Sequence, residues 1–293
     1  MIKRFLDYLR YEKNRSPLTV KAYGDDLVAF EAYFTGLDGQ LSWTSVDSDV
    51  IRDWMESMMD KGHTATTINR RLSAVRSLYR FAMSRGLVQK DPSRIVNGPR
   101  KDKPLPQFMR EREMDRLLDG MEWDMSSYKE VRARTIILMF YSTGIRLAEL
   151  VGLDDRHVDF SICELKVTGK RNKQRIVPFG EELSRALQDY MELRNRVTGV
   201  QDSALFQTSR GERMDADRVR YEVRKYLGLV STRRKRSPHV LRHTFATAML
   251  NNDAGLESVR KLLGHESLST TEIYTHTTFE QLKKVYSNAH PRA

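Results

Sequence analysis

The sequence predicts a two-domain, mainly helical protein whose second domain carries a small antiparallel sheet. Three observations support this fold class. Residues 1–96 show apolar residues at helical spacing, with capping signals between the segments. Residues 97–107 contain three prolines, which is typical of an extended linker. Residues 108–293 mix helical patterns with two strand-like runs around a glycine turn. We therefore expect a helical domain at 1–96, a linker at 97–107 and a mixed α/β domain at 108–293.

Capping signals place the helices of the first domain. After a short opening helix, Ser16-Pro17 supplies an N-cap followed by proline at the first helical position. Another helix begins after the Asp47/Ser48 cap and stops at Gly62. A fourth helix spans 66–85, with an apolar stripe on one side.

That fourth helix also carries basic residues, mostly off the apolar stripe: Arg70, Arg71, Arg76 and Arg80. A helix of this kind can lie in a DNA major groove with its back against a core. The arginines taken alone fit a solvated helix face equally well. We expect them to contact DNA.

The second domain combines a hairpin with several helices. The expected strands are Glu164–Val167 and Arg175–Phe179, on either side of a turn centred on Gly169. The expected helices that follow are Glu181–Arg194, Ala216–Tyr226, Arg242–Asn251 and Leu256–Leu263.

Composition limits the classes of partner and compartment. Lys and Arg exceed Asp and Glu by 50 to 39, a formal net charge of +11, which favours a polyanionic partner such as nucleic acid. The single cysteine excludes an intramolecular disulfide and a cysteine-rich metal site. No apolar run approaches the roughly 20 residues that span a bilayer, and the N-terminus is unlike a signal peptide. We expect a cytoplasmic protein with no membrane partner.

Candidate residues for phosphodiester cleavage lie in the second domain. Such cleavage requires an in-line nucleophile, neutralisation of the non-bridging oxygens and a proton for the leaving oxygen. The sequence shows no acidic cluster suited to magnesium, so we expect neither a metal ion nor another cofactor. Arg146, three residues before Glu149, is an arginine that a local acid can orient towards a phosphate. By itself this pair is more typical of a surface ion pair.

Three further segments add to this set. Lys170 lies at the hairpin turn, where a lysine can enter a groove and protonate a leaving alkoxide, although a solvated basic turn has the same composition. His239 and Arg242, three apart at a helix start, can converge on one phosphate. His265 precedes a polar loop that ends at Tyr274. Expected DNA contacts close to these segments are Arg171, Lys173, Arg233, Arg234, Lys235 and Arg236.

The four segments, in this order, resemble the tyrosine recombinase (phage integrase) family, and most closely its bacterial Xer members. The resemblance covers essentially the whole chain, including the closing His290-Pro291-Arg292-Ala293. It implies an N-terminal SAM-like core-binding domain before the catalytic domain. This chain differs from many relatives at Arg171, where they often have glycine, and Lys173 is a second lysine in the same loop as Lys170.

The resemblance implies a role for each residue. Tyr274 would attack the scissile phosphate and form a 3′-phosphotyrosyl link, releasing a 5′-hydroxyl. Arg146 and Arg242 would stabilise the transition state. Lys170 would be the general acid, His239 would assist proton transfer, and His265 would hydrogen-bond the phosphate.

The resemblance also implies partners. These are double-stranded DNA and a tetramer on two DNA sites, built from this chain alone or with a paralogous recombinase. A septal DNA translocase is a further expectation. The segment 278–293 would be a tail helix that docks on a neighbouring protomer through Leu282, Val285 and Tyr286. The expected cellular role is resolution of chromosome dimers at cell division.

Four alternatives stay open on the sequence. An integrase of a mobile element would use the same chemistry, and a type IB topoisomerase would apply similar residues to one duplex. A catalytically silent DNA-binding protein on the same scaffold would not need the complete set of six site residues. A helix-turn-helix regulator would leave the second domain unexplained.

Overall fold

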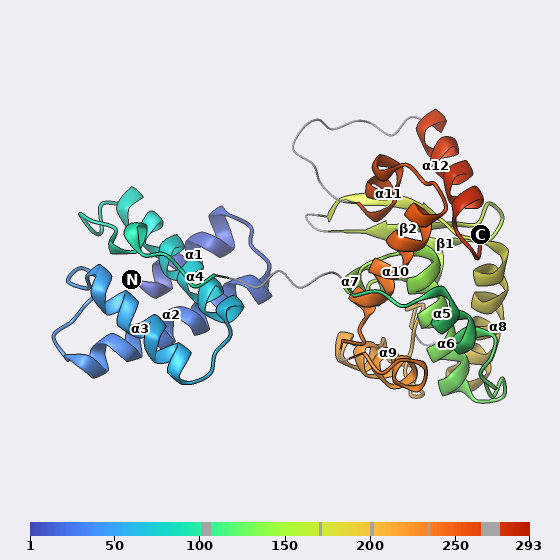
Figure 1. Cartoon of the computed structure of the whole chain (residues 1–293), viewed down its shortest axis with the longest axis horizontal. Helices are drawn as coiled ribbons and strands as arrows, with labels where there is room; N and C mark the ends of the chain where they lie inside the picture. The colour runs from blue at the N-terminus through green and yellow to red at the C-terminus, as the bar shows by residue number, and fades with distance from the viewer. Residues whose placement is uncertain (101–106, 170–171, 200–201, 234, 265–275) are drawn as a thin grey trace. The chain divides into compact units, whose positions relative to one another are not determined.

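The chain folds into two compact units, Met1–Pro104 and Leu105–Ala293 (Figure 1). The computed structural model describes residues 1–100, 107–169, 172–199, 202–233, 235–264 and 276–293, with side chains from residue 280 onwards in the last range. The finer limits of the linker, 97 and 107, stay a prediction.

The first unit is helical, and its expected caps are confirmed. The Ser16 hydroxyl accepts a hydrogen bond from the Thr19 amide (3.3 Å), and the Asp47 carboxylate accepts from the amides of Asp49 and Val50. The elements are α1 (Ile2–Asp7), the π-helix η1 (Tyr8–Glu12), α2 (Pro17–Leu37), α3 (Ser48–Asp60), α4 (Ala65–Ser84) and the 3-10 helix η2 (Pro92–Ile95). One apolar core, rich in aromatic rings, joins all of these elements except η2.

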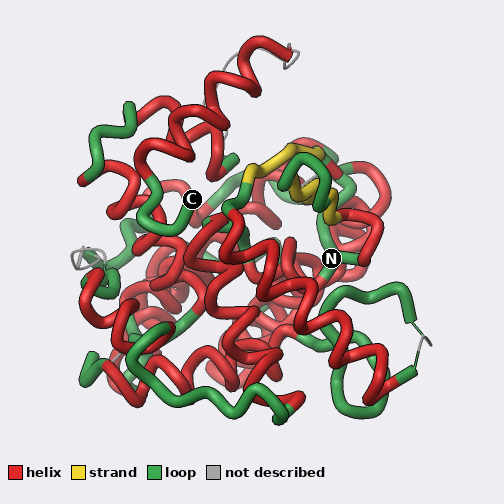
Figure 2. Tube along the Cα trace, turned by 90° about the vertical axis from the view of Figure 1, so that its right-hand side faces the viewer, coloured by secondary structure: helices red, strands yellow, loops and turns green. Residues whose placement is uncertain are grey.

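The second unit surrounds one central helix, α6 (Tyr128–Thr143), which is buried on almost every side. The unit also contains a three-stranded antiparallel sheet in the order β1-β2-β3, the yellow segment of Figure 2. The sheet consists of β1 (Val158–Asp159), β2 (Glu164–Thr168) and β3 (Gln174–Pro178). The other elements are α5 (Glu111–Leu118), α7 (Leu147–Val151), the 3-10 helix η3 (Asp155–His157), α8 (Glu181–Thr198), α9 (Ala216–Val230), α10 (Pro238–Asn251), α11 (Leu256–Leu263) and α12 (His276–Ala289).

These elements confirm the predicted fold class of mainly helical structure with a small antiparallel sheet. The predicted hairpin strands and the four predicted helices after them are all present, and most differ only at their ends. Among the described residues, no helix is both long and apolar enough to cross a membrane.

The tail helix α12 packs on its own chain. Leu282 and Tyr286 are buried in a small apolar core with Phe245 and Met249 of α10 and with α11. Lys283 donates a hydrogen bond to the Ile162 carbonyl, which ties the helix to the turn before β2 (2.7 Å). Docking of this helix on a neighbouring protomer stays a prediction.

The last residues anchor that helix through a buried histidine. His290 is 5 % exposed and packs among the rings of Tyr141, Phe245 and Tyr286. Its Nδ1 accepts a hydrogen bond from the Arg292 amide (3.1 Å), so its Nε2 donates to the Tyr141 carbonyl (3.1 Å). Burial lowers the pKa of His290 to about 4, because a charged ring would lose water and would place a proton against the Arg292 amide.

We expect this histidine to make stability depend on pH. A buried histidine whose folded pKa lies below its unfolded value of about 6.5 contributes stability above that value and loses it as the pH falls towards the folded pKa. Between about pH 7 and about pH 5, the free energy of unfolding should fall by roughly 2 kcal/mol because of this histidine. Chemical unfolding of the wild type and of His290→Gln at several pH values measures this fall. The variant keeps a donor for Tyr141 but does not titrate, and identical pH slopes would contradict the prediction.

Candidate active site

Gly144 closes α6 and brings the next turn against α10 and α11. Its φ of +60° is left-handed, and a Cβ there would lie 2.5 Å from Phe245 and 2.8 Å from Leu263. A Thr-Gly pair can also precede a helix, but here α6 ends at this point, and α7 begins at Leu147 with Arg146 as its N-cap. Glycine in a left-handed conformation is a common helix stop.

Arg146 is held by the buried carboxylate of Glu149. Glu149 accepts from the backbone amide of Arg146 (2.7 Å) and from its Nη1 (2.9 Å). The predicted pairing is therefore confirmed, but it is not an ordinary surface ion pair, since the Glu149 side chain is only 2 % exposed. The Arg146 side chain remains 37 % exposed and so can present part of its guanidinium to a ligand.

Arg242, on the first turns of α10, is buried beside Arg146. Its Nη1 donates to the Gly144 carbonyl and its Nη2 to the Leu263 carbonyl (2.7 Å). Burial, together with the positive charge of Arg146, lowers the pKa of Arg242 to about 10. A buried cation among other cations is costly, so the site favours an anion that would share the charge.

A third arginine, on β3, completes this cluster. Arg175 donates to both oxygens of Glu149, from Nη1 (2.7 Å) and Nη2 (2.9 Å), and from Nε to the Leu262 carbonyl (3.1 Å). Burial alone would raise the pKa of Glu149, but the hydrogen bonds and charge of Arg175, with those of Arg146, lower it overall. Glu149 is therefore a carboxylate shared between two arginines.

The C-terminus of α11 organises all three arginines. Three consecutive carbonyls each accept from a different guanidinium: Leu262 from Arg175, Leu263 from Arg242, and Gly264 from Arg146 (3.0 Å). The partial negative charge at a helix C-terminus stabilises nearby cations. The next residue in the sequence is position 265, so the cluster lies at the start of the segment 265–275.

Sequence reasoning did not single out Arg175. A signal was present, because alternation along β3 places Arg175 on the same face as the buried Val177. A charged residue at an inward position of a strand requires a buried partner. The partner here is Glu149, which the sequence pattern relates only to Arg146.

The other expected site residues fall into two groups. His239 is exposed at the start of α10, one turn before Arg242. Lys170, Arg171, Arg234, His265 and Tyr274 lie outside the described residues. The catalytic roles of all six expected residues therefore stay predictions.

The basic residues next to the site differ in their surroundings. Lys173 and Lys235 are exposed. Arg233 lies over the Phe108 ring and 3.7 Å from Glu113. Arg236 is half-buried against Gly228. These positions leave the two lysines most accessible to a polyanion, and DNA contact stays a prediction for all four.

The four arginines of α4 also differ. Arg70 and Arg71 both pair with the buried Asp26. Arg76 donates to the carbonyls of Ser93 and Val96, which fixes η2. Arg70 and Arg80 are exposed, whereas Arg71 and Arg76 are half-buried. Arg70, Arg71 and Arg76 thus have structural contacts, and DNA contact stays a prediction for all four arginines of α4.

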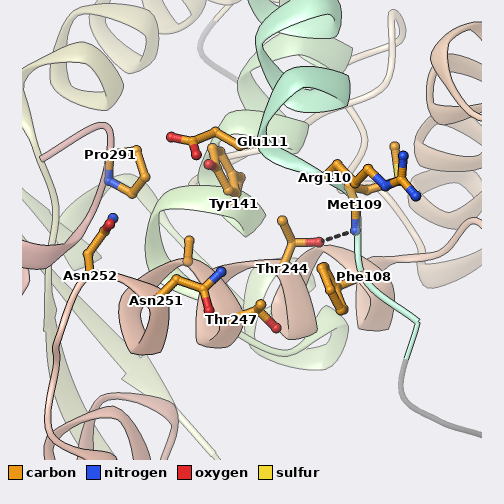
Figure 3. Close-up of a pocket in the computed structure, with 11 residues that line it drawn as sticks. Phe108, Met109, Arg110, Glu111, Tyr141, Thr244, Thr247, Asn251, Asn252 and Pro291 are labelled. Atoms are coloured by element: carbon orange, nitrogen blue, oxygen red, sulfur yellow. Dashed lines mark hydrogen bonds between the residues drawn. The ribbon is translucent and has the colours of Figure 1, made fainter.

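A small cavity in this unit has a lining that does not include the arginine cluster; Figure 3 shows that lining. That cavity, of about 60 Å³, lies between α5, α10 and the C-terminal residues, where the Thr244 hydroxyl accepts from the Met109 amide (2.9 Å). Arg146, Arg175 and Arg242 do not line it. Among the described residues, no group of three or more His, Cys, Asp or Glu side chains is arranged to hold a metal ion.

Comparison with known proteins matches both units. The model of the phage integrase family matches residues 107–281, and that of the phage integrase N-terminal SAM-like domain matches residues 2–86. The tyrosine recombinase XerC of Pelotomaculum thermopropionicum is 40% identical over 302 residues, covering 100% of this chain and 98% of that protein. XerC of Chlorobaculum tepidum is 37% identical, covering 99% and 94%.

A solved structure shares the fold. The XerH site-specific recombinase bound to its difH substrate, in a pre-cleavage complex, superposes with a TM-score of 0.69. The match covers 98% of this chain and 82% of that one, at 20% sequence identity.

Proposed function

The chain belongs to the phage integrase family of tyrosine recombinases, and we propose that it acts at one specific DNA site to resolve chromosome dimers at cell division. As a member of this family it cuts and rejoins DNA. The single observation that most supports the site is the convergence of Arg146, Arg175 and Arg242 on three consecutive carbonyls directly before position 265.

In the proposed reaction, Tyr274 attacks the scissile phosphate and the 5′-oxygen leaves. Arg146 and Arg242 bind the non-bridging oxygens, whose negative charge increases in the transition state. Lys170 protonates the leaving 5′-oxygen, His239 assists proton transfer at the tyrosine, and His265 hydrogen-bonds the phosphate. The 3′-phosphotyrosyl link keeps the energy of the broken bond, so a second 5′-hydroxyl can reverse the reaction without ATP.

The proposed partners follow from two duplexes exchanging strands. Four protomers, of this chain alone or with a paralogue, would hold two DNA sites in the cytoplasm, and a septal DNA translocase would activate them. The relatives named XerC and the DNA-bound XerH structure support this assignment. The net charge of +11 suits the large phosphate surface of such a complex.

The experiment that tests the proposal captures the covalent intermediate. The protein is incubated with fragmented host DNA in EDTA and denatured with detergent, and protein-bound fragments are sequenced at their ends. We expect 3′-linked ends at one chromosomal locus. Nicked substrates of that locus, which release the 5′-hydroxyl strand and prevent religation, provide the quantitative version of the assay.

Other results would select the alternatives. Adducts at scattered loci would favour a type IB topoisomerase or a mobile-element integrase. Binding without an adduct on nicked DNA, with the paralogue present, would favour a silent DNA-binding protein and would reject the proposed function.

A further inference from the structure

Arg175 contacts both of the groups that fix Arg146. Glu149 binds Arg146 from one side, and the Gly264 carbonyl accepts from its Nη2 on the other. We propose that Arg175 is a positioning residue, which holds Arg146 in its phosphate-binding orientation through Glu149 and the end of α11. The inference rests on the proposed function, since it concerns the same site.

The first contact is the shared carboxylate. Each oxygen of Glu149 accepts one hydrogen bond from Arg146 and one from Arg175: Oε1 from the two Nη1 atoms, and Oε2 from the Arg146 amide and Arg175 Nη2. A planar guanidinium that binds both oxygens fixes the rotation of the carboxylate. Without the Arg175 guanidinium, the Glu149 carboxylate could rotate about its last side-chain torsion. The Arg146 guanidinium, which is hydrogen-bonded to that carboxylate, would then change its orientation.

The second contact is the backbone of Gly264. This residue has a left-handed φ of +64°, and a Cβ there would lie 3.1 Å from Cδ, Nε and Cζ of Arg175. The Arg175 side chain therefore passes close to the residue whose carbonyl binds Arg146, and the absence of a side chain at Gly264 leaves room for it there. Its hydrogen bond to Leu262, two residues earlier, holds the same turn. Arg175 thus fixes both the acid and the carbonyl that orient Arg146.

Direct contact of Arg175 with the phosphate is disfavoured because its guanidinium is already committed to protein groups. Its Nη1 and Nη2 both bind the Glu149 carboxylate, and its Nε donates to the Leu262 carbonyl. The effect of Arg175 on the reaction would therefore pass through Arg146. A change of about 1 Å in a reacting group can slow an enzyme on the order of 100-fold.

The test uses Arg175→Lys and Arg175→Gln, because neither side chain can bind both carboxylate oxygens as a planar fork. The matched control is Arg194→Lys. Arg194 is also buried and donates to both oxygens of Asp155 (2.7 Å each), but it contacts none of the site residues. Single-turnover cleavage of nicked DNA is measured at saturating DNA, below the melting temperature of every variant. DNA affinity is measured in parallel.

We expect the Arg175 variants to cleave about 10- to 100-fold more slowly than the wild type, with unchanged DNA affinity. Arg194→Lys should lower the melting temperature and leave the cleavage rate within about twofold. A second substrate carries a methyl group in place of one non-bridging oxygen of the scissile phosphate. The methyl group removes the negative charge that Arg146 neutralises. On this substrate, the cleavage rates of the Arg175 variants should therefore differ less from the wild-type rate.

The outcomes separate this inference from the proposed function. No cleavage by the wild type would reject the function itself. With an active wild type, a defect equal to that of Arg194→Lys would overturn the positioning role, and so would a defect equally large on both substrates. Loss of folding in both Arg175 variants, with Arg194→Lys folded, would also overturn it, because Arg175 would then support the fold as a whole.

Discussion

Tyr274→Phe is expected to abolish the covalent protein–DNA adduct completely. Phenylalanine keeps the ring but has no oxygen to attack the phosphate, so neither cleavage nor strand exchange can begin. DNA binding should persist, because every basic side chain expected to contact phosphates is unchanged in this variant. Adduct formation on nicked DNA, with binding measured by a mobility shift, checks both statements.

Tyr286→Phe is the matched control in the same C-terminal region. Tyr286 is 1 % exposed, and burial raises the pKa of its hydroxyl far above the usual range, so it cannot act as a nucleophile. This variant should form adducts at close to the wild-type rate. Adducts that persisted in Tyr274→Phe would show that another side chain attacks the phosphate, and the proposed mechanism would be wrong.

Arg242→Gln has the second largest expected effect, a fall of about 100- to 1,000-fold in the cleavage rate. This is the usual cost of removing one preorganised donor from a site that stabilises developing negative charge. Arg242 is suited to this role because it is buried, is held by two carbonyls and lies beside other arginines. The rate is measured in single turnovers on nicked DNA.

A stability measurement must accompany that rate. Glutamine can still donate to one of the two carbonyls, and it removes a buried charge whose desolvation is costly. We therefore expect only a modest change in melting temperature. A cleavage rate within tenfold of the wild type would exclude Arg242 from transition-state stabilisation.

Much of the fold follows from local sequence signals. Ser16 and Asp47 cap the helices that they were expected to cap, and Leu256–Leu263 forms a helix with the predicted bounds. Capping and helical-spacing signals depend on residues three or four apart, so they can be read from one short segment of the sequence. The hairpin was also predictable, because alternation and a glycine turn are equally local.

The signals were ambiguous where one residue type serves two purposes. Gly144 can precede a helix or end one, and only the packing of Phe245 and Leu263 against it shows which applies. A strand arginine such as Arg175 can point to solvent or inward. The choice depends on whether a buried acid lies opposite, and that acid is 26 residues away in the sequence.

The sequence by itself determined the family and the mainly helical fold class, and it predicts the set of six catalytic residues, because these depend on residue type and order. The tertiary structure decided how Arg146, Arg175 and Arg242 meet at the end of α11 around one shared carboxylate. It also decided that His290 is buried and neutral. Both results arise from contacts between segments far apart in the chain. An unpaired charge is costly when it is buried, so the folded chain pairs the buried arginines with an acid and carbonyls and leaves the buried histidine uncharged.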